Sequence, residues 1–178
     1  MTSKQTNSAW PILSSLAILT ILFLSSCVYD APLTEENKIP IDEAIVGLWG
    51  HATKDKEESD PGPELMILKY SDTEYLVHYP ANKKGFYFRG YPIKISGVSC
   101  VQLEVIGTSE GRLKEDFDSR FRVMSYQVTD QGLVIRELND DLVNSDLKTS
   151  EELRKAFVEH KDHEFLFTKP QRFEKVEN

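Results

Sequence analysis

The feature that most restricts the fold of this chain is a series of short apolar runs, separated by turn residues, from residue 45 to the end. In several runs the apolar side chains recur at every second position, which is the period of a half-buried β-strand. Tyr75, Val77 and Tyr79, for example, fall on one side of an extended chain. Seven or eight short strands at even spacing predict an antiparallel barrel or sandwich rather than an α/β fold.

The positions of the strands follow from the alternation and from the turn residues between the runs. Strands are expected at residues 45–49, 65–70, 74–79, 86–95, 98–106, 121–128, 133–138 and 164–168. Phe173 and Val176 are candidates to extend the last of these strands. The apolar phase changes between Val123 and Met124, as it does where a β-bulge inserts one residue.

The period changes to that of a helix once, at about residues 150–160. Thr149 followed by Glu152 fits a capping box, which satisfies the first amide groups of a helix. Leu153, Phe157 and His160 then lie on one helical face. The predicted fold class is therefore mainly β, an antiparallel barrel or half-open barrel with one late α-helix.

Residues 1–26 have the three parts of an export signal. A polar head with one cation, Lys4, is followed by an apolar centre over residues 12–24 and by two serines that precede Cys27. The apolar run of 17 residues from Trp10 to Ser26 is short for a membrane span of about 20 residues. A cleaved signal peptide is therefore favoured over an uncleaved transmembrane helix.

The segment Leu24-Ser25-Ser26-Cys27 resembles the lipobox of bacterial lipoproteins. This resemblance implies that the Cys27 thiol carries acyl chains such as palmitate, and that the leader is removed just before it. Two or three acyl chains give stable anchoring in a membrane. Val28, in place of Asp, implies by the same resemblance a protein of the bacterial outer membrane that faces the periplasm. Residues 27–42 contain two prolines and are expected to form a flexible tether, and residues 43–178 to form one barrel domain.

Net charge and cysteine content indicate which partners and which disulfide bonds are expected. The leader carries one lysine and no acid, so its removal changes the net charge from −8 to −9. An acidic domain is a poor partner for nucleic acid and gains nothing from anionic lipid headgroups. With Cys27 acylated, Cys100 has no disulfide partner, and its apolar surroundings in the sequence predict a buried structural thiol.

Gly47-Leu48-Trp49 on the first strand, followed by a strand meander, a helix and one short strand, is similar to the lipocalin and wider calycin pattern. The resemblance implies that Gly47 and Trp49 start the first strand and that Trp49 closes the barrel floor. A basic residue from near the end of the chain, Arg172 or alternatively Arg154, would cover the ring.

The same resemblance implies a barrel cavity for a small apolar or amphipathic ligand. The aromatic residues expected to line it are Tyr75, Tyr79, Phe86, Phe88, Phe121 and Tyr126. The alternative is that side chains simply fill the small barrel. For any single aromatic residue, packing in the core is about three times more common than contact with a ligand.

Motifs for catalysis and metal binding are weak. Gly107-Thr108-Ser109-Glu110-Gly111 has the letters of a nucleophile elbow, but that elbow needs a following helix within an α/β sheet. His160 and His163 are spaced to share a metal, although solvated residues at a helix end are the more common case. We expect no enzyme activity, no cofactor and no metal.

Two functions follow from these observations. The first is a lipid-anchored envelope protein that binds a small apolar or amphipathic ligand in a lipocalin-like barrel without chemistry. The second is an envelope protein–protein interaction or structural module with a filled barrel, which meets its partner through an outer face or through residues 51–63. An open apolar interior distinguishes the first from the second.

Overall fold

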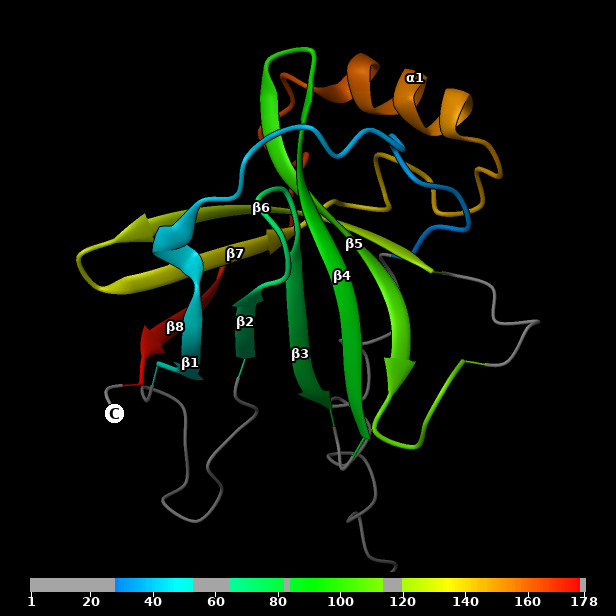
Figure 1. Cartoon of the computed structure of the whole chain (residues 1–178). Coiled ribbons are helices and arrows are strands. Elements are labelled where there is room, and N and C mark those ends of the chain that lie inside the picture. Colours follow the sequence, from blue (N-terminus) through cyan, green and yellow to red (C-terminus); the bar gives the residue numbers. More distant parts are fainter. Residues whose placement is uncertain (1–27, 53–64, 82–83, 114–119, 177–178) are drawn as a thin grey trace, which may run out of the picture.

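Eight antiparallel strands form a closed barrel in the computed structural model, which describes residues 28–52, 65–81, 84–113 and 120–176 (Figure 1). The strands are β1 Gly47–His51, β2 Leu65–Lys69, β3 Tyr75–Ala81, β4 Lys84–Ile95, β5 Val98–Thr108, β6 Phe121–Thr129, β7 Gly132–Glu137 and β8 Gln171–Lys175. A 3-10 helix, η1 (Glu43–Ile45), precedes β1, and an α-helix, α1 (Ser150–His160), lies between β7 and β8. The predicted barrel with one late α-helix is confirmed, and it is closed rather than half-open.

The barrel closes because β8 pairs with both β7 and β1. Phe173 of β8 lies opposite Leu133 on one side and His51 on the other. The strand expected at residues 164–168 contributes a single bridge, between Leu138 and Phe167, so this prediction was wrong. The physical reason is burial, since Phe173 is 2% exposed inside the barrel whereas Phe165 is 59% exposed.

The antiparallel order gives the barrel two ends. η1 and the β2–β3 and β6–β7 turns lie at one end, here called the η1 end. The connections that follow β1, β3, β5 and β7 lie at the other, here called the loop end. Residues 53–63, a segment proposed above to meet a partner, fall outside the described residues.

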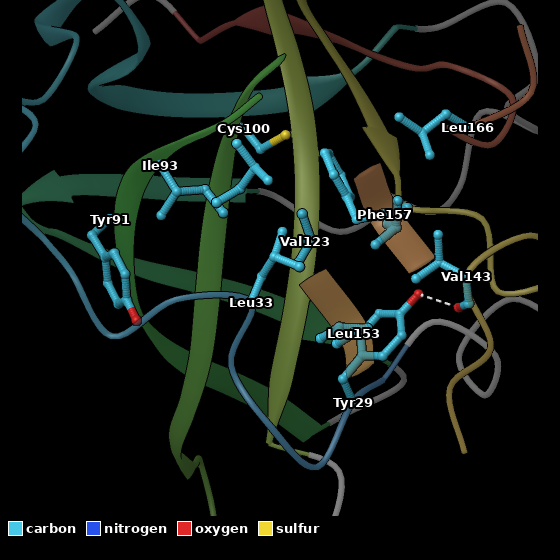
Figure 2. Packing of buried hydrophobic residues seen from close by; sticks show 12 residues of the cluster. Tyr29, Leu33, Tyr91, Ile93, Cys100, Val123, Val143, Leu153, Phe157 and Leu166 are labelled. Carbon is cyan, nitrogen blue, oxygen red and sulfur yellow. Dashed lines mark hydrogen bonds between the residues drawn. The ribbon is translucent and has the colours of Figure 1, made fainter. Parts of the chain in front are cut away.

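Both faces of the sheet bury apolar side chains, so the protein has two cores. The inner core fills the barrel and consists of Ile45, Trp49, Leu65, Ile67, Tyr75, Val77, Phe88, Val101, Leu103, Val105, Leu133 and Phe173. The outer core lies under α1 and the N-terminal segment (Figure 2) and consists of Tyr29, Leu33, Tyr91, Ile93, Ile95, Cys100, Val123, Leu138, Val143, Leu153, Phe157 and Leu166.

The two cores explain the change of apolar phase in β6. Val123 packs into the outer core, whereas its neighbour Met124 packs against the inner core. The pairing of β6 with β5 runs through Val123 and Met124 without a shift, so no bulge lies there and that prediction was wrong. The shift lies between β4 and β5 instead, where Tyr87 faces Gly107 but Phe88 faces Val105.

The N-terminal segment of residues 28–42, here called the strap, lies on the domain instead of extending from it (Figure 1). Tyr29, Ala31 and Leu33 are buried, and the backbone of Tyr29 forms two hydrogen bonds with Phe121 at the start of β6. Full burial of a side chain such as Leu33 contributes about 1.5–3 kcal/mol, which offsets the entropic cost of ordering its neighbours. The described part of the expected tether is therefore packed, and alternation at residues 29, 31 and 33 is the sequence signal that indicates it.

Gln102 holds the middle of the strap by its side-chain amide. Its Oε1 accepts hydrogen bonds from the backbone nitrogens of Leu33 (2.6 Å) and Thr34 (3.3 Å). Its Nε2 donates to the carbonyl oxygen of Thr34 (2.9 Å) and to the hydroxyl of Tyr91 (2.5 Å). A fully buried amide with every group in use fixes the strap in one register.

α1 begins and packs as its sequence predicts. The Thr149 hydroxyl accepts a hydrogen bond from the Glu152 backbone nitrogen (3.2 Å) and donates one to the Glu152 carboxylate (2.8 Å). Leu153 and Phe157 are fully buried against the outer core, and His160 is half-buried. The α-helix therefore packs against the outside of the barrel.

Candidate functional site

The η1 end of the barrel is closed by Trp49 and the residues around it. The Trp49 Nε1 donates a hydrogen bond to the carbonyl oxygen of Ile45 in η1 (2.9 Å). The Lys175 Nζ lies 5.5 Å from the centre of the Trp49 ring, within the range of a cation–π interaction. Gly47 has a φ of +147°, and a Cβ at this position would lie 3.2 Å from the Lys175 Cε. The glycine thus leaves space for the lysine that covers the tryptophan.

The cation over Trp49 is Lys175, and neither Arg172 nor Arg154 takes that place. Arg172 is exposed on β8 opposite Val134, and Arg154 lies on α1 outside the barrel. Because Phe173 faces inward, alternation along β8 points Lys175 inward and Arg172 outward. Correct placement of β8 in the sequence, with Phe173 as its inward residue, would have identified the lysine.

Five of the six expected ligand-lining aromatic residues belong to the inner core, and Phe121 does not. Tyr75 and Phe88 are buried members of that core, and Tyr79, Phe86 and Tyr126 pack against it half-buried. Phe121 packs against the outer core, next to the strap.

A polar cluster of Asp42, Tyr75 and Tyr126 seals the η1 end further. The Tyr75 hydroxyl accepts a hydrogen bond from the Asp42 backbone nitrogen (2.6 Å), and the Tyr126 hydroxyl donates to the Asp42 carboxylate (3.2 Å). Burial is the largest cause that raises the pKa of both tyrosines. Both phenols therefore stay protonated at neutral pH and act as hydrogen-bonding groups.

At the loop end, the barrel interior is both polar and apolar, because it contains an ion pair beside apolar side chains. The Arg122 Nη1 lies 2.8 Å from the Glu137 Oε1, and each side chain is 16% exposed. Arg122 is paired with Leu103 of the inner core, which places it on the inner face of the sheet. Its Nε is buried and has no hydrogen-bond partner among the described residues.

Tyr79 lies close enough to this ion pair to respond to its charges. Burial is the main reason that the pKa of Tyr79 is raised, and the Glu137 carboxylate raises it further while Arg122 opposes this. Half-buried Tyr79 and Phe86, which are paired across β3 and β4, thus form an amphipathic wall together with the ion pair. Such a wall suits a small molecule that has one apolar and one polar end.

Two hollows lie outside the barrel, beside the strap. One, of about 620 Å³, lies between the strap and α1 and is lined by Leu33, Thr34, Glu35, Ser150, Glu151, Arg154, Lys155 and Val158. This is here called the strap–helix hollow. The other, of about 70 Å³, is lined by residues that include Ile39, Ile93 and Arg154. The first is large enough for several side chains of a partner.

Ser109 lies in a turn rather than in a nucleophile elbow. Its hydroxyl accepts a hydrogen bond from the Gly85 backbone nitrogen (3.0 Å), and the residues after it form a bridge between Thr108 and Gly111 instead of a helix. His78 also lies against Gly85, but among the described residues no hydrogen bond joins His78 to Ser109.

The remaining candidate residues have structural surroundings. His163 Nδ1 accepts a hydrogen bond from the Phe165 backbone nitrogen (3.1 Å), and the described part of the chain contains no group of three or more His, Cys, Asp or Glu placed to hold a metal. Cys100 is a free thiol buried in the outer core, and burial raises its pKa to about 12. It is therefore unreactive at neutral pH.

Cys27 and the leader fall outside the described residues. Within the residues that are described, no helix has both the length and the apolar character needed to cross a bilayer. Comparisons with protein-family models, curated proteins and solved structures found no match.

Proposed function

We propose that this protein is a lipid-anchored, non-enzymatic module of a bacterial cell envelope that contacts a protein partner through the strap–helix hollow. The observation that carries the proposal is the contrast between a barrel interior packed with twelve buried apolar residues and an open hollow of about 620 Å³ outside it. An eight-stranded barrel is just wide enough for side chains to fill it. The filled barrel then serves as a rigid scaffold.

Cellular placement in the proposal rests on the lipobox-like segment that ends at Cys27. An acylated cysteine holds the protein to a membrane, by resemblance the outer membrane, with the barrel in the periplasm. The net charge of −9 without the leader makes the lipid chains responsible for attachment, because the acidic domain is not attracted to anionic headgroups.

The strap–helix hollow has the composition of a small protein-binding surface. Leu33 and Val158 contribute apolar surface, Arg154 and Lys155 contribute cations, and glutamates from the strap and from α1 complete the rim. An apolar centre inside a charged rim is the usual anatomy of a protein interface. The fitting partner is a segment of another envelope protein that carries an apolar side chain flanked by charges of both signs.

Photo-crosslinking from two valines of similar exposure tests this surface. Val158 (36% exposed) lines the hollow, and Val128 (41% exposed) lies at the far end of β6. With a photo-reactive residue at position 158, we expect one dominant crosslinked adduct in intact cells. The same residue at position 128 should give no such adduct. The double variant Arg154→Glu with Lys155→Glu should weaken the adduct formed from position 158. Equal adducts at both positions would overturn the proposed contact surface.

A second candidate function, small-ligand binding, is supported by the loop end of the barrel. Half-buried Tyr79 and Phe86 together with the Arg122–Glu137 ion pair offer an amphipathic wall, and the unpartnered Arg122 Nε offers a donor. Native mass spectrometry of the domain from Cys27 to Asn178, released gently from its own membranes, separates the two candidates. A stoichiometric small molecule favours ligand binding, and a clean apo mass with no lipid-dependent thermal shift favours the interaction module.

A further inference from the structure

The strap begins its contacts with the domain almost at once after Cys27. Tyr29 is fully buried, and its hydroxyl donates a hydrogen bond to the carbonyl oxygen of Val143 (2.9 Å) (Figure 2). Its backbone nitrogen and oxygen pair with Phe121 at 2.8 and 2.9 Å. Asp30 next to it forms an ion pair with Lys148 (2.6 Å). Four polar contacts thus hold two residues in place before the strap reaches Gln102.

The distance from Cys27 to this fixed point is short. Neighbouring Cα atoms are 3.8 Å apart, so the Cα of Cys27 lies within about 8 Å of the Cα of Tyr29. A flexible tether over residues 27–42 would instead span about 50 Å when extended. Because the strap is packed on the domain, it cannot hold the domain at such a distance from Cys27.

We infer that the bilayer lies directly against the face made by the start of β6 and by the loop of residues 139–149, with the barrel held in one orientation. The inference rests on the lipid anchor proposed above. Acyl chains on Cys27 enter the membrane beside Tyr29, Phe121 and Val143, because those residues fix the chain within two positions of the anchor.

The fixed orientation places the far end of β6 away from the membrane. β6 runs from Phe121 to Thr129, and a strand rises about 3.3 Å per residue, so the β6–β7 turn lies about 26 Å from the anchored end of the strand. Figure 1 shows β6 as a long arrow that leads from the beginning of the strap, drawn in blue, to this turn. The membrane-facing loop contains exposed acids such as Asp141 and Asp146, so the matching surface is a zwitterionic bilayer rather than an anionic one.

Two single-cysteine labels at exposed positions test the orientation. Asp146→Cys lies between Val143 and Lys148, which both contact the strap, and Gln131→Cys lies in the β6–β7 turn. Cys100 does not take up the label, because it is buried and its pKa is raised to about 12. The acylated protein is purified from its membranes and reconstituted into phosphatidylcholine vesicles that contain headgroup nitroxide lipid.

We expect the fluorophore at position 146 to be quenched at least threefold more than the one at position 131. A matched variant carries a twelve-residue Gly-Ser insert between Val28 and Tyr29. The insert keeps the lipid anchor and lets the domain move away from the membrane surface. In this variant the difference between the two labels should disappear. Unchanged thermal midpoints establish that each variant folds.

The outcomes separate the inference from the anchor on which it rests. Protein that floats with the vesicles but shows equal quenching at both positions overturns the fixed orientation and leaves the anchor standing. Protein that does not float, or a Cys27→Ala variant that floats equally well, overturns the lipid anchor and the orientation together.

Discussion

The Nζ of Lys175 lies 5.5 Å from the centre of the Trp49 ring, and this contact joins the first and last strands of the barrel. Trp49 and Lys175 are also directly paired across β1 and β8. The contact closes the barrel at the η1 end, with Gly47 providing the space for the lysine side chain. Closure of the ring of strands therefore depends on residues that are more than a hundred positions apart in the chain.

Replacement of Lys175 by Met should lower the free energy of unfolding by about 0.5–1 kcal/mol, the usual strength of such a cation–π contact at a partly exposed site. Arg172→Met on the same strand is the control, since Arg172 is exposed and surface changes stay within about 0.5 kcal/mol. Trp49 is the one tryptophan in the sequence from Cys27 to Asn178, so its fluorescence in that domain reports directly on the change. An emission shift with Arg172→Met and none with Lys175→Met would contradict the assignment.

Replacement of Gln102 by Leu should destabilise the domain strongly, because the buried backbone nitrogen of Leu33 then loses its hydrogen-bond acceptor. Each buried polar group left unpaired costs about 1–3 kcal/mol. Urea unfolding of this variant measures the loss, and Gln127→Leu, at an exposed position of β6, is the control. Proteolysis should also cleave the strap of the Gln102→Leu variant first. Equal stability of the two variants would show that the amide does not hold the strap.

The interior ion pair should show strong coupling between its two members. Removal of one partner by Arg122→Met leaves the Glu137 charge buried, which costs about 3–5 kcal/mol in comparable pairs. The double variant Arg122→Met with Glu137→Met should recover most of that loss, since apolar residues of similar volume can replace a buried pair. A double-mutant cycle by urea unfolding measures the coupling. Additive losses in the double variant would place the two side chains in independent, solvated surroundings.

The ion pair of Glu74 with Arg89 predicts a stability that depends on pH. The hydrogen bond from Arg89 is the largest cause that lowers the pKa of Glu74 below its usual value of 4.5, with Asn37 contributing in the same direction and burial opposing. A carboxyl group with a lowered pKa in the folded state stabilises the protein above its unfolded pKa. That stability is lost as the pH falls from about 4.5 through the lower folded value.

Glu74→Gln removes this part of the pH dependence. Thermal unfolding between pH 7 and pH 3 should therefore show a smaller loss in the variant than in the parent protein. Glu159→Gln, at an exposed position near the end of α1, should retain the parent's profile. A Glu74→Gln profile that follows the parent's at every pH would disprove the contribution of Glu74.

Local sequence patterns predicted most of the secondary structure. The period-two alternation of apolar side chains marked seven of the eight strands to within two residues of their observed ends. The capping residue Thr149, together with Leu153 and Phe157, marked α1. These patterns succeed because a strand or a helix turns its apolar residues to one side within a few positions, and that spacing is written in the chain.

The strap and β8 were misplaced because their positions depend on distant partners. Residues 29–33 carry apolar alternation, but distant residues such as Gln102, Phe121 and Val143 hold them on the domain. Phe165 and Phe173 are equally apolar in the sequence, and only barrel closure buries the second.

Sequence alone thus predicts the positions of seven strands and of the helix, because each depends on neighbouring residues. The lipobox-like anchor stays a prediction from the sequence. Which cation covers Trp49, which core each face of β6 enters and where the hollow opens depend on the closed barrel. The physical reason is that burial on both faces of one sheet is a property of contacts between distant segments. A period of two in the sequence of one strand shows that the two faces of the strand differ in polarity. Which core each face packs against is decided by the segments that lie next to it in the folded protein.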